Sequence, residues 1–380
     1  MIRQPKPLVV QYLYVHTGGE AFSYPSVRSR PAAMSVAARY LECALTQAAS
    51  LRLRNLDCGL ALVTNTTEPR ALGRAGTRLL RELEALDVQV VHSEYHHRPS
   101  DETAHYVSSR YVLDAILAAG EGQPDERPLF MTDLDCVWLD PPALFAAVPS
   151  PPEVGCLYIE YPADGDGVGA GETGRTRRKM GALADSLAGA VQRVPSLAGG
   201  GFADAPELSE RERERRALDA LHLPRWVGGE LLVGTAGALR ELVGACERVD
   251  ALMAERGESL LTEEQVLTLA GALGLIEFRE LHELAWRVHT GPRHEAHLGE
   301  DTLSLALWHL PSEKGLSLRR TANEVCRGRT RALRRDLGDP ARMARRFNVA
   351  GNGVARRLRD DGWIAALRAS NALRARLGHR

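Results

Sequence analysis

The chain has 380 residues, of which 44% are hydrophobic and 26% charged, and its formal net charge is −1. These values are ordinary for a soluble globular protein with a substantial core, and they allow one large domain or two of ordinary size. The sequence contains no run of about eighteen apolar residues, so a membrane-spanning helix is not expected.

Charge is unevenly distributed along the chain. Residues 319–380 contain 17 arginines and 5 acidic residues, a net charge of +12, which leaves −13 for residues 1–318. The sequence therefore predicts an acidic main body (1–318) and a basic extension (319–380). The six cysteines form no CxxC pair and lack the spacing of a zinc site. A reduced, cytoplasmic setting is the simplest account of them.

Strands and helices alternate at the start of the chain. We expect strands at 8–15, 60–64 and 88–91, and helices at 33–53 and 71–86. Such alternation predicts an α/β fold with a mixed, mostly parallel sheet and helices on both faces.

The first predicted strand ends in a glycine-containing loop, His16-Thr17-Gly18-Gly19. Many open α/β sheets bind a nucleotide at such a place, which makes Tyr14, His16 and Thr17 candidate nucleotide contacts. The loop lacks the GxGxxG fingerprint, so a dehydrogenase is not supported.

Two aspartates follow the predicted strand at 129–131, after a helix at 107–119 that carries Arg110 in its first turns. Asp133 and Asp135 are two residues apart, so on an extended backbone they project to the same side. Two carboxylates at the carboxyl end of a strand suit a divalent cation that also holds a diphosphate. An ordinary acidic turn at the end of a strand is the alternative interpretation.

The rest of the body contains further predicted elements. They are a strand at 154–159, a strand at 226–234, a helix at 236–254, a helix that opens near 261–267, and residues 275–288, which would complete the sheet. Thr262 and Gln265 have the spacing of a helix capping box. The glycine-rich segment 162–181, with Arg175, Arg177, Arg178 and Lys179, predicts either a flexible active-site lid or disorder.

In this order, four segments resemble those of glycosyltransferases with the Rossmann-like GT-A fold, in the glycogenin-like and bacterial galactosyltransferase-like families. Residues 130–138 (FMTDLDCVW) resemble the family's DxD segment, and Arg110 lies where these families place a basic residue near the donor. Residues 226–233 (WVGGELLV) followed by Glu264-Gln265 resemble a strand and an acidic-Gln pair, although the family's Asn is missing and Glu264 replaces an Asp. Residues 308–315 (WHLPSEKG) resemble the closing H-x-x-G-x-K segment.

The resemblance implies a metal-dependent transfer of a sugar from a nucleotide-diphospho-sugar, with a UDP-sugar favoured, to a small-molecule or glycan acceptor, with retention of configuration. It implies that Asp133, Asp135 and His309 hold Mn²⁺ or Mg²⁺ and that Lys314 pairs with the diphosphate. Arg110 would contact the donor. Glu230, Glu264 and Gln265 are the candidate catalytic or acceptor-positioning residues.

Two other functional classes stay open at this stage. A nucleotidyltransferase that makes sugar nucleotides also uses acidic metal ligands, but it would normally carry basic residues after the first strand. A non-catalytic nucleotide-sugar-binding protein is the other alternative.

The basic extension is predicted to be helical except around Gly338-Asp339-Pro340 and Gly351-Asn352-Gly353. Its apolar positions suggest helices that bury one face and expose arginines on the other. We expect it to pack on the body or in a homodimer, with peripheral membrane contact as the alternative. Nucleic-acid binding is not expected, because Phe347 and Trp363 are its only aromatic residues and base stacking needs more.

Overall fold

The structure is a computed structural model that describes residues 5–16, 33–99, 107–158, 226–255, 257–288 and 300–349. Thr17, the predicted lid at 162–181 and residues 350–380 lie outside these ranges. Within them, no helix has both the length and the apolar character needed to cross a membrane.

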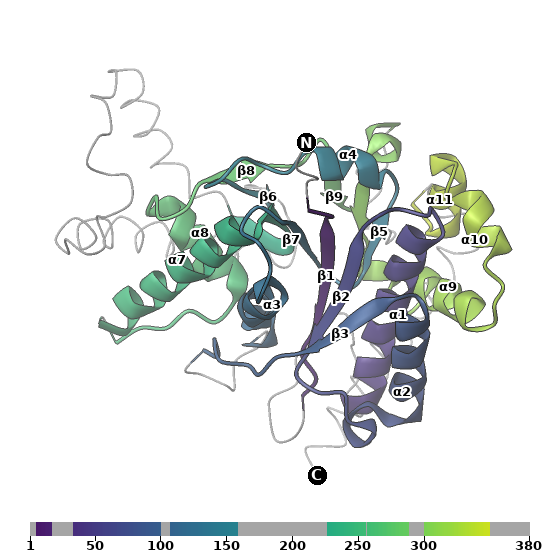
Figure 1. Ribbon diagram of the computed structural model, residues 1–380, viewed down its shortest axis with the longest axis horizontal. Coiled ribbons are helices and arrows are strands. Elements are labelled where there is room, and N and C mark those ends of the chain that lie inside the picture. The colour runs from purple at the N-terminus through teal and green to yellow at the C-terminus, as the bar shows by residue number, and fades with distance from the viewer. Residues whose placement is uncertain are drawn as a thin grey trace, which may run out of the picture.

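A seven-stranded sheet forms the centre of the molecule (Figure 1). Its strands, in spatial order, are β3 (Val88–His92), β2 (Gly59–Thr64), β1 (Leu8–Leu13), β4 (Pro128–Thr132), β7 (Val227–Thr235), β6 (Val154–Tyr158) and β8 (Phe278–Glu280). Strand β7 runs antiparallel to both of its neighbours, and the other pairs are parallel. The predicted mixed, mostly parallel sheet is confirmed.

Helices cover both faces of this sheet, as expected from the alternation of elements. Side chains alternate along each strand, so that Val9 of β1 joins one hydrophobic cluster and Val10 joins the other. The first cluster lies under α1 (Ala33–Arg52) and α2 (Pro69–Ala85), and the second under α3 (Tyr111–Gly120), α7 (Ala236–Glu255) and α8 (Glu263–Ala272). Figure 1 shows these two groups of helices on opposite sides of β1 and β2.

A second, three-stranded sheet lies beside the first and consists of β5 (Cys136–Trp138), β10 (Leu307–His309) and β9 (Ala285–Arg287). The expectation that residues 275–288 complete one sheet is therefore wrong in part. Only β8 joins the main sheet, because turn residues between Leu281 and Leu284 redirect the chain and let β9 pair with β10. The short helix α4 (Pro141–Ala146) follows β5.

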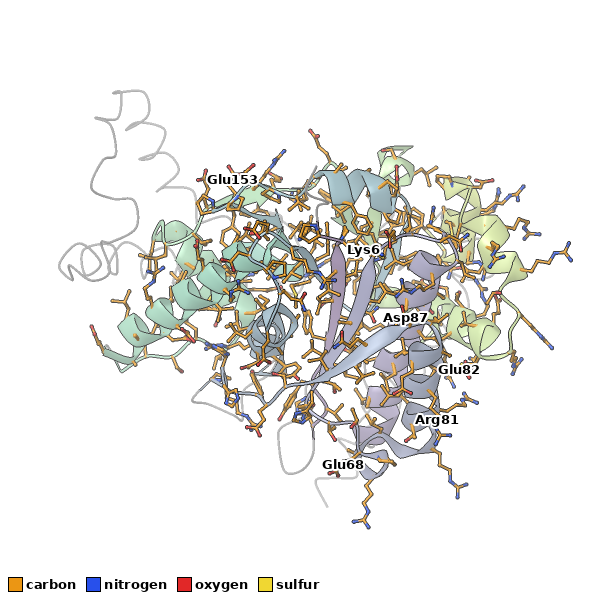
Figure 2. The ribbon with its side chains drawn as sticks, viewed as in Figure 1. Lys6, Glu68, Arg81, Glu82, Asp87 and Glu153 are labelled. Atoms are coloured by element: carbon orange, nitrogen blue, oxygen red, sulfur yellow. The ribbon has the colours of Figure 1, made fainter. Side chains whose placement is uncertain are left out.

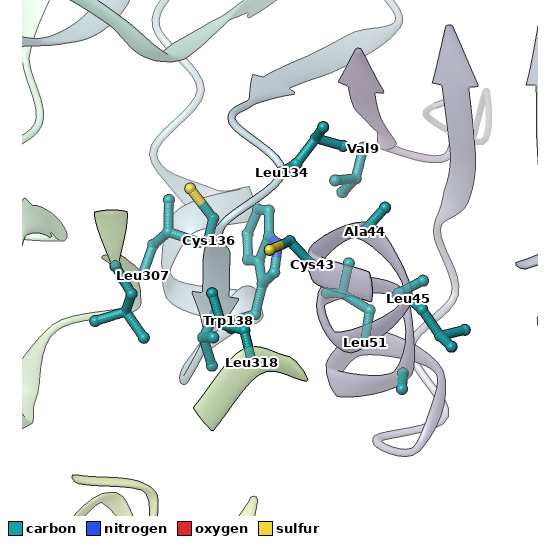
Figure 3. Packing of buried hydrophobic residues seen from close by; sticks show 14 of the residues in the cluster. Val9, Cys43, Ala44, Leu45, Leu51, Leu134, Cys136, Trp138, Leu307 and Leu318 are labelled. Carbon is teal, nitrogen blue, oxygen red and sulfur yellow. The ribbon is translucent and has the colours of Figure 1, made fainter. Parts of the chain in front are cut away.

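Trp138 of β5 joins the small sheet to the helical layer. It is fully buried. Figure 3 shows it among Cys43 of α1, Leu307 of β10 and Leu318 of α9 (Ser317–Cys326). The small sheet is thereby held against α1, and the turn between β4 and β5 is fixed at both ends.

The described part of the basic extension packs against the body. After the turns η3 (Glu300–Ser304) and η4 (Pro311–Glu313), the chain forms α9, α10 (Arg331–Asp336) and α11 (Pro340–Arg346). The break before Pro340 agrees with the sequence. Leu333, Met343 and Phe347 are fully buried in the cluster that also contains α1. The predicted boundary at 318 falls inside α9, and the division into body and extension stays a prediction.

A candidate metal and nucleotide site at the end of β4

The two aspartates lie where the chain leaves the main sheet and enters the small one. The backbone N–H of Asp133 donates to the carbonyl of Glu230 on β7 at 2.9 Å, which extends the β4–β7 ladder by one bond. The carbonyl of Asp135 accepts from the N–H of Leu310, just after β10, at 3.0 Å. Hydrogen bonds from both sheets therefore fix this turn.

His309, at the end of β10, faces both aspartates. Its Nε2 atom lies 3.3 Å from Asp133 Oδ2 and 3.2 Å from Asp135 Oδ2. One potential ligand atom from each of the three residues lies within 4.8 Å of the others. Asp135 and His309 are buried, whereas the Asp133 side chain is 33% exposed. The opening of the cluster is therefore on the Asp133 side.

Lys314 follows η4 and adds a positive charge beside Asp135. Its Nζ lies 3.0 Å from Asp135 Oδ2 and over the ring of Tyr40 of α1. Burial alone would raise the pKa of Asp135, but the charges of Lys314 and His309 outweigh it and lower that pKa. Burial would likewise lower the pKa of His309, and the surrounding carboxylates, led by Asp135, raise it well above its usual range. Asp135 is thus a carboxylate, and His309 carries a proton between the two aspartates.

These donors fit a divalent cation. Two carboxylates and an imidazole suit Mn²⁺ and also admit Mg²⁺. Asp135 Oδ2 and both ring nitrogens of His309 are buried. Within the part of the chain that the structure describes, they make no hydrogen bond of good geometry despite their close charged neighbours. Buried polar atoms of this kind indicate a ligand that completes them. Asp133, Asp135 and His309 are the residues that would hold it.

Tyr12 of β1 is a site residue that the sequence analysis did not identify. Its hydroxyl donates to Asp133 Oδ1 at 2.8 Å and lies 3.3 Å from the carbonyl of Gly229. Burial, and then the negative charges of Asp133 and Glu263, raise the pKa of Tyr12 well above its usual range. The hydroxyl therefore keeps its proton and orients the more exposed aspartate. The sequence contains a signal for this, because Tyr12 and Tyr14 are two residues apart in the strand predicted at 8–15 and therefore project to the same face of the sheet.

Glu230 and Glu264 share one arginine, Arg287 of β9. Arg287 Nε donates to Glu230 Oε1 at 3.0 Å, and Arg287 Nη2 lies 3.6 Å from Glu264 Oε1. Trp226 also donates to Glu264, at 2.8 Å. Burial would raise the pKa of Glu230, but Arg287 and then His309 lower it to about 2. Glu230 is therefore ionised at neutral pH.

Glu263 is a second residue that the sequence analysis missed, although it stands beside Glu264 at the start of α8. Burial and the charge of Glu264 raise the pKa of Glu263 to about 8, and Asp133 adds to the shift. Its Oε2 atom is buried and accepts no hydrogen bond from the described residues. The N-terminus of α8 thus presents two carboxyl groups. That of Glu263 holds a proton at neutral pH, and that of Glu264 is neutralised by Arg287.

Gln265 lies in the capping box that its spacing predicts. Thr262 Oγ1 accepts from the N–H of Gln265 at 3.4 Å, and Gln265 Oε1 accepts from the N–H of Leu261 at 2.8 Å and of Thr262 at 3.4 Å. Its side-chain oxygen is therefore engaged by the helix end. The catalytic role assigned to it stays a prediction.

The proposed nucleotide contacts lie in a different environment from the metal cluster. The guanidinium of Arg110 is buried and pairs with Asp250 and the carbonyl of Leu260, 3.1 Å away. Tyr14 is buried and packs edge-on against His16, with ring centroids 5.0 Å apart. Tyr14 also accepts from Arg98 at 3.0 Å. Thr17 lies outside the described residues. Nucleotide binding by these residues stays a prediction.

Comparisons with solved structures find glycosyltransferases. A galactosyltransferase, LgtC, in complex with donor and acceptor sugar analogues matches with a TM-score of 0.45 and 9% identity, over 84% of this chain and 95% of that one. An active-site variant of LgtC matches with a TM-score of 0.44, 12% identity and the same coverage. The bifunctional glycosyltransferase WbbM matches with a TM-score of 0.41 and 10% identity, over 81% of this chain and 46% of that one.

No family model and no curated protein matches the sequence. The function must therefore be inferred from the residues of the site.

Proposed function

We propose that this chain is a metal-dependent glycosyltransferase that moves a sugar from a nucleotide-diphospho-sugar to an acceptor hydroxyl. The observation that carries the proposal is the convergence of Asp133, Asp135 and His309 at the carboxyl end of β4. Ligands bind outside the carboxyl ends of strands in open α/β sheets, and this cluster lies at that edge. A small-molecule or glycan acceptor, a UDP-sugar donor and retention of configuration follow from the resemblance in the sequence.

The chemistry of the transfer explains the charges of the site. When the bond between the sugar and the diphosphate breaks, negative charge develops on the departing phosphate oxygen. A divalent cation, when bound, stabilises that charge electrostatically. The chain's part is to fix the ligands beforehand: both aspartates are held by backbone bonds from two sheets, and Tyr12 orients Asp133.

Lys314 supplies a second positive charge on the side of Asp135. Its amine pairs with Asp135 and keeps that carboxylate ionised in a buried setting. A fixed ammonium near a diphosphate favours the charged leaving group over the intact donor. Glu264 and the protonated Glu263 stand at the start of α8, and we propose that one of them hydrogen-bonds a sugar hydroxyl.

A donor screen tests this function. Purified protein is incubated with UDP-, GDP- and dTDP-sugars, with Mn²⁺, Mg²⁺ or EDTA, and the released nucleoside diphosphate and sugar are measured. We expect release with one donor class, and only in the presence of metal. Release should fall at least about 100-fold in Asp135→Asn, because a ligand of the cation that stabilises the leaving group is lost.

The matched control is Asp87→Asn. Asp87 lies in the turn before β3, at the opposite edge of the sheet, and is shown with its side chain in Figure 2. The Asp87→Asn variant also loses one carboxylate, but it should retain transferase activity. Formation of a sugar nucleotide from nucleoside triphosphate and sugar phosphate would favour the nucleotidyltransferase instead. Donor binding with no turnover on any acceptor or on water would favour the binding protein.

A further inference from the structure

Glu230 lies on the buried side of the metal cluster and not on the exposed side near Asp133. Its side chain is 2% exposed, so it has almost no surface from which to reach an acceptor hydroxyl. Its Oε1 atom lies 3.8 Å from Nδ1 of His309, on the side of the imidazole opposite the two aspartates. A general base must come within hydrogen-bond reach of the proton that it removes. Glu230 is instead at ion-pair distance from the ring nitrogen that would not bind the cation.

The arrangement follows from strand pairing. The carbonyl of Glu230 accepts from the N–H of Asp133, so Glu230 lies directly across the β4–β7 ladder from the first aspartate. On the other side, β9 and β10 are paired so that Arg287 stands beside His309. Arg287 then donates to the same Glu230 oxygen, Oε1, at 3.0 Å. Two separate ladders therefore bring Arg287, Glu230 and His309 into one chain of contacts.

We propose that Glu230 is a positioning residue, which holds the proton on Nδ1 of His309 so that Nε2 faces Asp133 and Asp135 as a metal ligand. The inference rests on the proposed function of the site. An imidazole that binds a metal through one nitrogen carries its proton on the other, and a carboxylate partner for that proton fixes the ring orientation and makes the ligand more basic. Arg287 keeps the carboxylate in place and ionised.

Gly228 makes room for this carboxylate. A Cβ atom added at Gly228 would overlap Oε2 of Glu230, so that only glycine lets the side chain lie along the strand. Gly234, six residues further along β7, offers a matched comparison, because its added Cβ would meet the nearest atom, Leu239 Cγ, at 3.4 Å, an ordinary contact. An alanine at Gly228 should therefore displace the Glu230 side chain, whereas an alanine at Gly234 should leave it in place.

The test measures Mn²⁺ binding by electron paramagnetic resonance, together with the visible absorption spectrum of the Co²⁺-loaded protein. Wild type, Glu230→Gln, Gly228→Ala and Gly234→Ala are compared, with folding checked by circular dichroism. We expect Mn²⁺ affinity about 10- to 100-fold lower in Glu230→Gln, with an altered Co²⁺ spectrum. Gly228→Ala should shift both readouts in the same direction, and Gly234→Ala should match wild type.

The inference would be overturned if folded Glu230→Gln kept the Mn²⁺ affinity and the Co²⁺ spectrum of the wild type. If kcat fell while metal binding stayed unchanged, Glu230 would instead be a catalytic base. If wild type itself binds no Mn²⁺, the proposed function fails before Glu230 is tested. Should the variants not fold, ¹⁵N signals of His309 in the Zn²⁺-loaded wild type decide: a protonated Nδ1 supports the inference, and a protonated Nε2 contradicts it.

Discussion

At the scale of single residues, the proton on His309 determines how the site meets a cation. Without metal, the imidazolium lies between Asp133 and Asp135, and its positive charge reduces the repulsion between the two carboxylates. A cation that binds through Nε2 must displace that proton, because a protonated nitrogen has no lone pair to offer. In the metal-free protein, the proton on Nε2 of His309 therefore occupies the place that the cation would take.

This exchange predicts proton release. The pKa of His309 in the folded, metal-free protein is raised above its usual value near 6.5, so His309 is charged at neutral pH. Mn²⁺ binding at pH 7 should release close to one proton, and the apparent affinity should fall as the pH is lowered. Calorimetry in buffers with different ionisation enthalpies measures the number of protons. A value near zero in wild type would show that His309 is neutral or is not a ligand, and His309→Gln should release none.

At the scale of elements, α8 shows how one segment can serve capping and chemistry together. Thr262 and Gln265 close the helix end, while Glu263 and Glu264 carry the charges. Glu264 resembles the family's acid by position, yet Arg287 and Trp226 already neutralise and bond it. Glu263 faces the Tyr12 and Gly229 side of the site: a Cβ added at Gly229 would lie 2.6 Å from its Cγ.

The capping box predicts that Gln265 and Thr262 behave alike. Gln265→Ala and Thr262→Ala should each lower the free energy of unfolding by about 1 kcal/mol, because each leaves helix N–H groups without a partner. Urea denaturation measures this loss, and turnover at saturating donor is measured beside it. Equal, modest losses of turnover in both variants would assign Gln265 to structure. A loss confined to Gln265→Ala would give it the catalytic role that the sequence suggested.

The elements that the sequence predicts well are those with local signals. The strand that stops just before Asp133 and the capping box at Thr262 are both predicted, because apolar periodicity and turn chemistry act over a few residues. The prediction that His309 lies close to Asp133 and Asp135 rests on the resemblance to a family and not on periodicity. Arg287 had no such signal, since its place beside Glu230 depends on how β9 pairs with β10, and the sequence analysis assigned that segment to the wrong sheet.

At the scale of the whole molecule, the helices after residue 316 complete the core. Glu313, fully buried beside Lys314, accepts from the N–H of Ser317 at the start of α9 at 3.2 Å and from Asn348 after α11 at 2.8 Å. One carboxylate therefore ties both ends of this helical segment to the turn that carries Lys314. Homodimer formation and membrane contact through the extension stay predictions.

This docking predicts a large cost for a substitution far from the site in sequence. Phe347 is fully buried against the cluster of α1, so Phe347→Ala should lower the free energy of unfolding by about 3–5 kcal/mol. Arg345→Ala, at an exposed position of α11, should change the free energy of unfolding by less than about 0.5 kcal/mol. Chemical denaturation of both variants provides the measurement. Equal stabilities would mean that α11 does not dock on the body in solution.

The proposed function requires that Asp133, Asp135 and His309 together bind the cation that holds a diphosphate donor. Anomalous diffraction from crystals grown with Mn²⁺ and UDP tests this requirement, because the metal is located by its own scattering. We expect one strong peak between these three side chains, with the diphosphate on the exposed side of Asp133 and near Lys314. A peak elsewhere, or Mn²⁺ bound without His309, would show that these residues do not form the metal site.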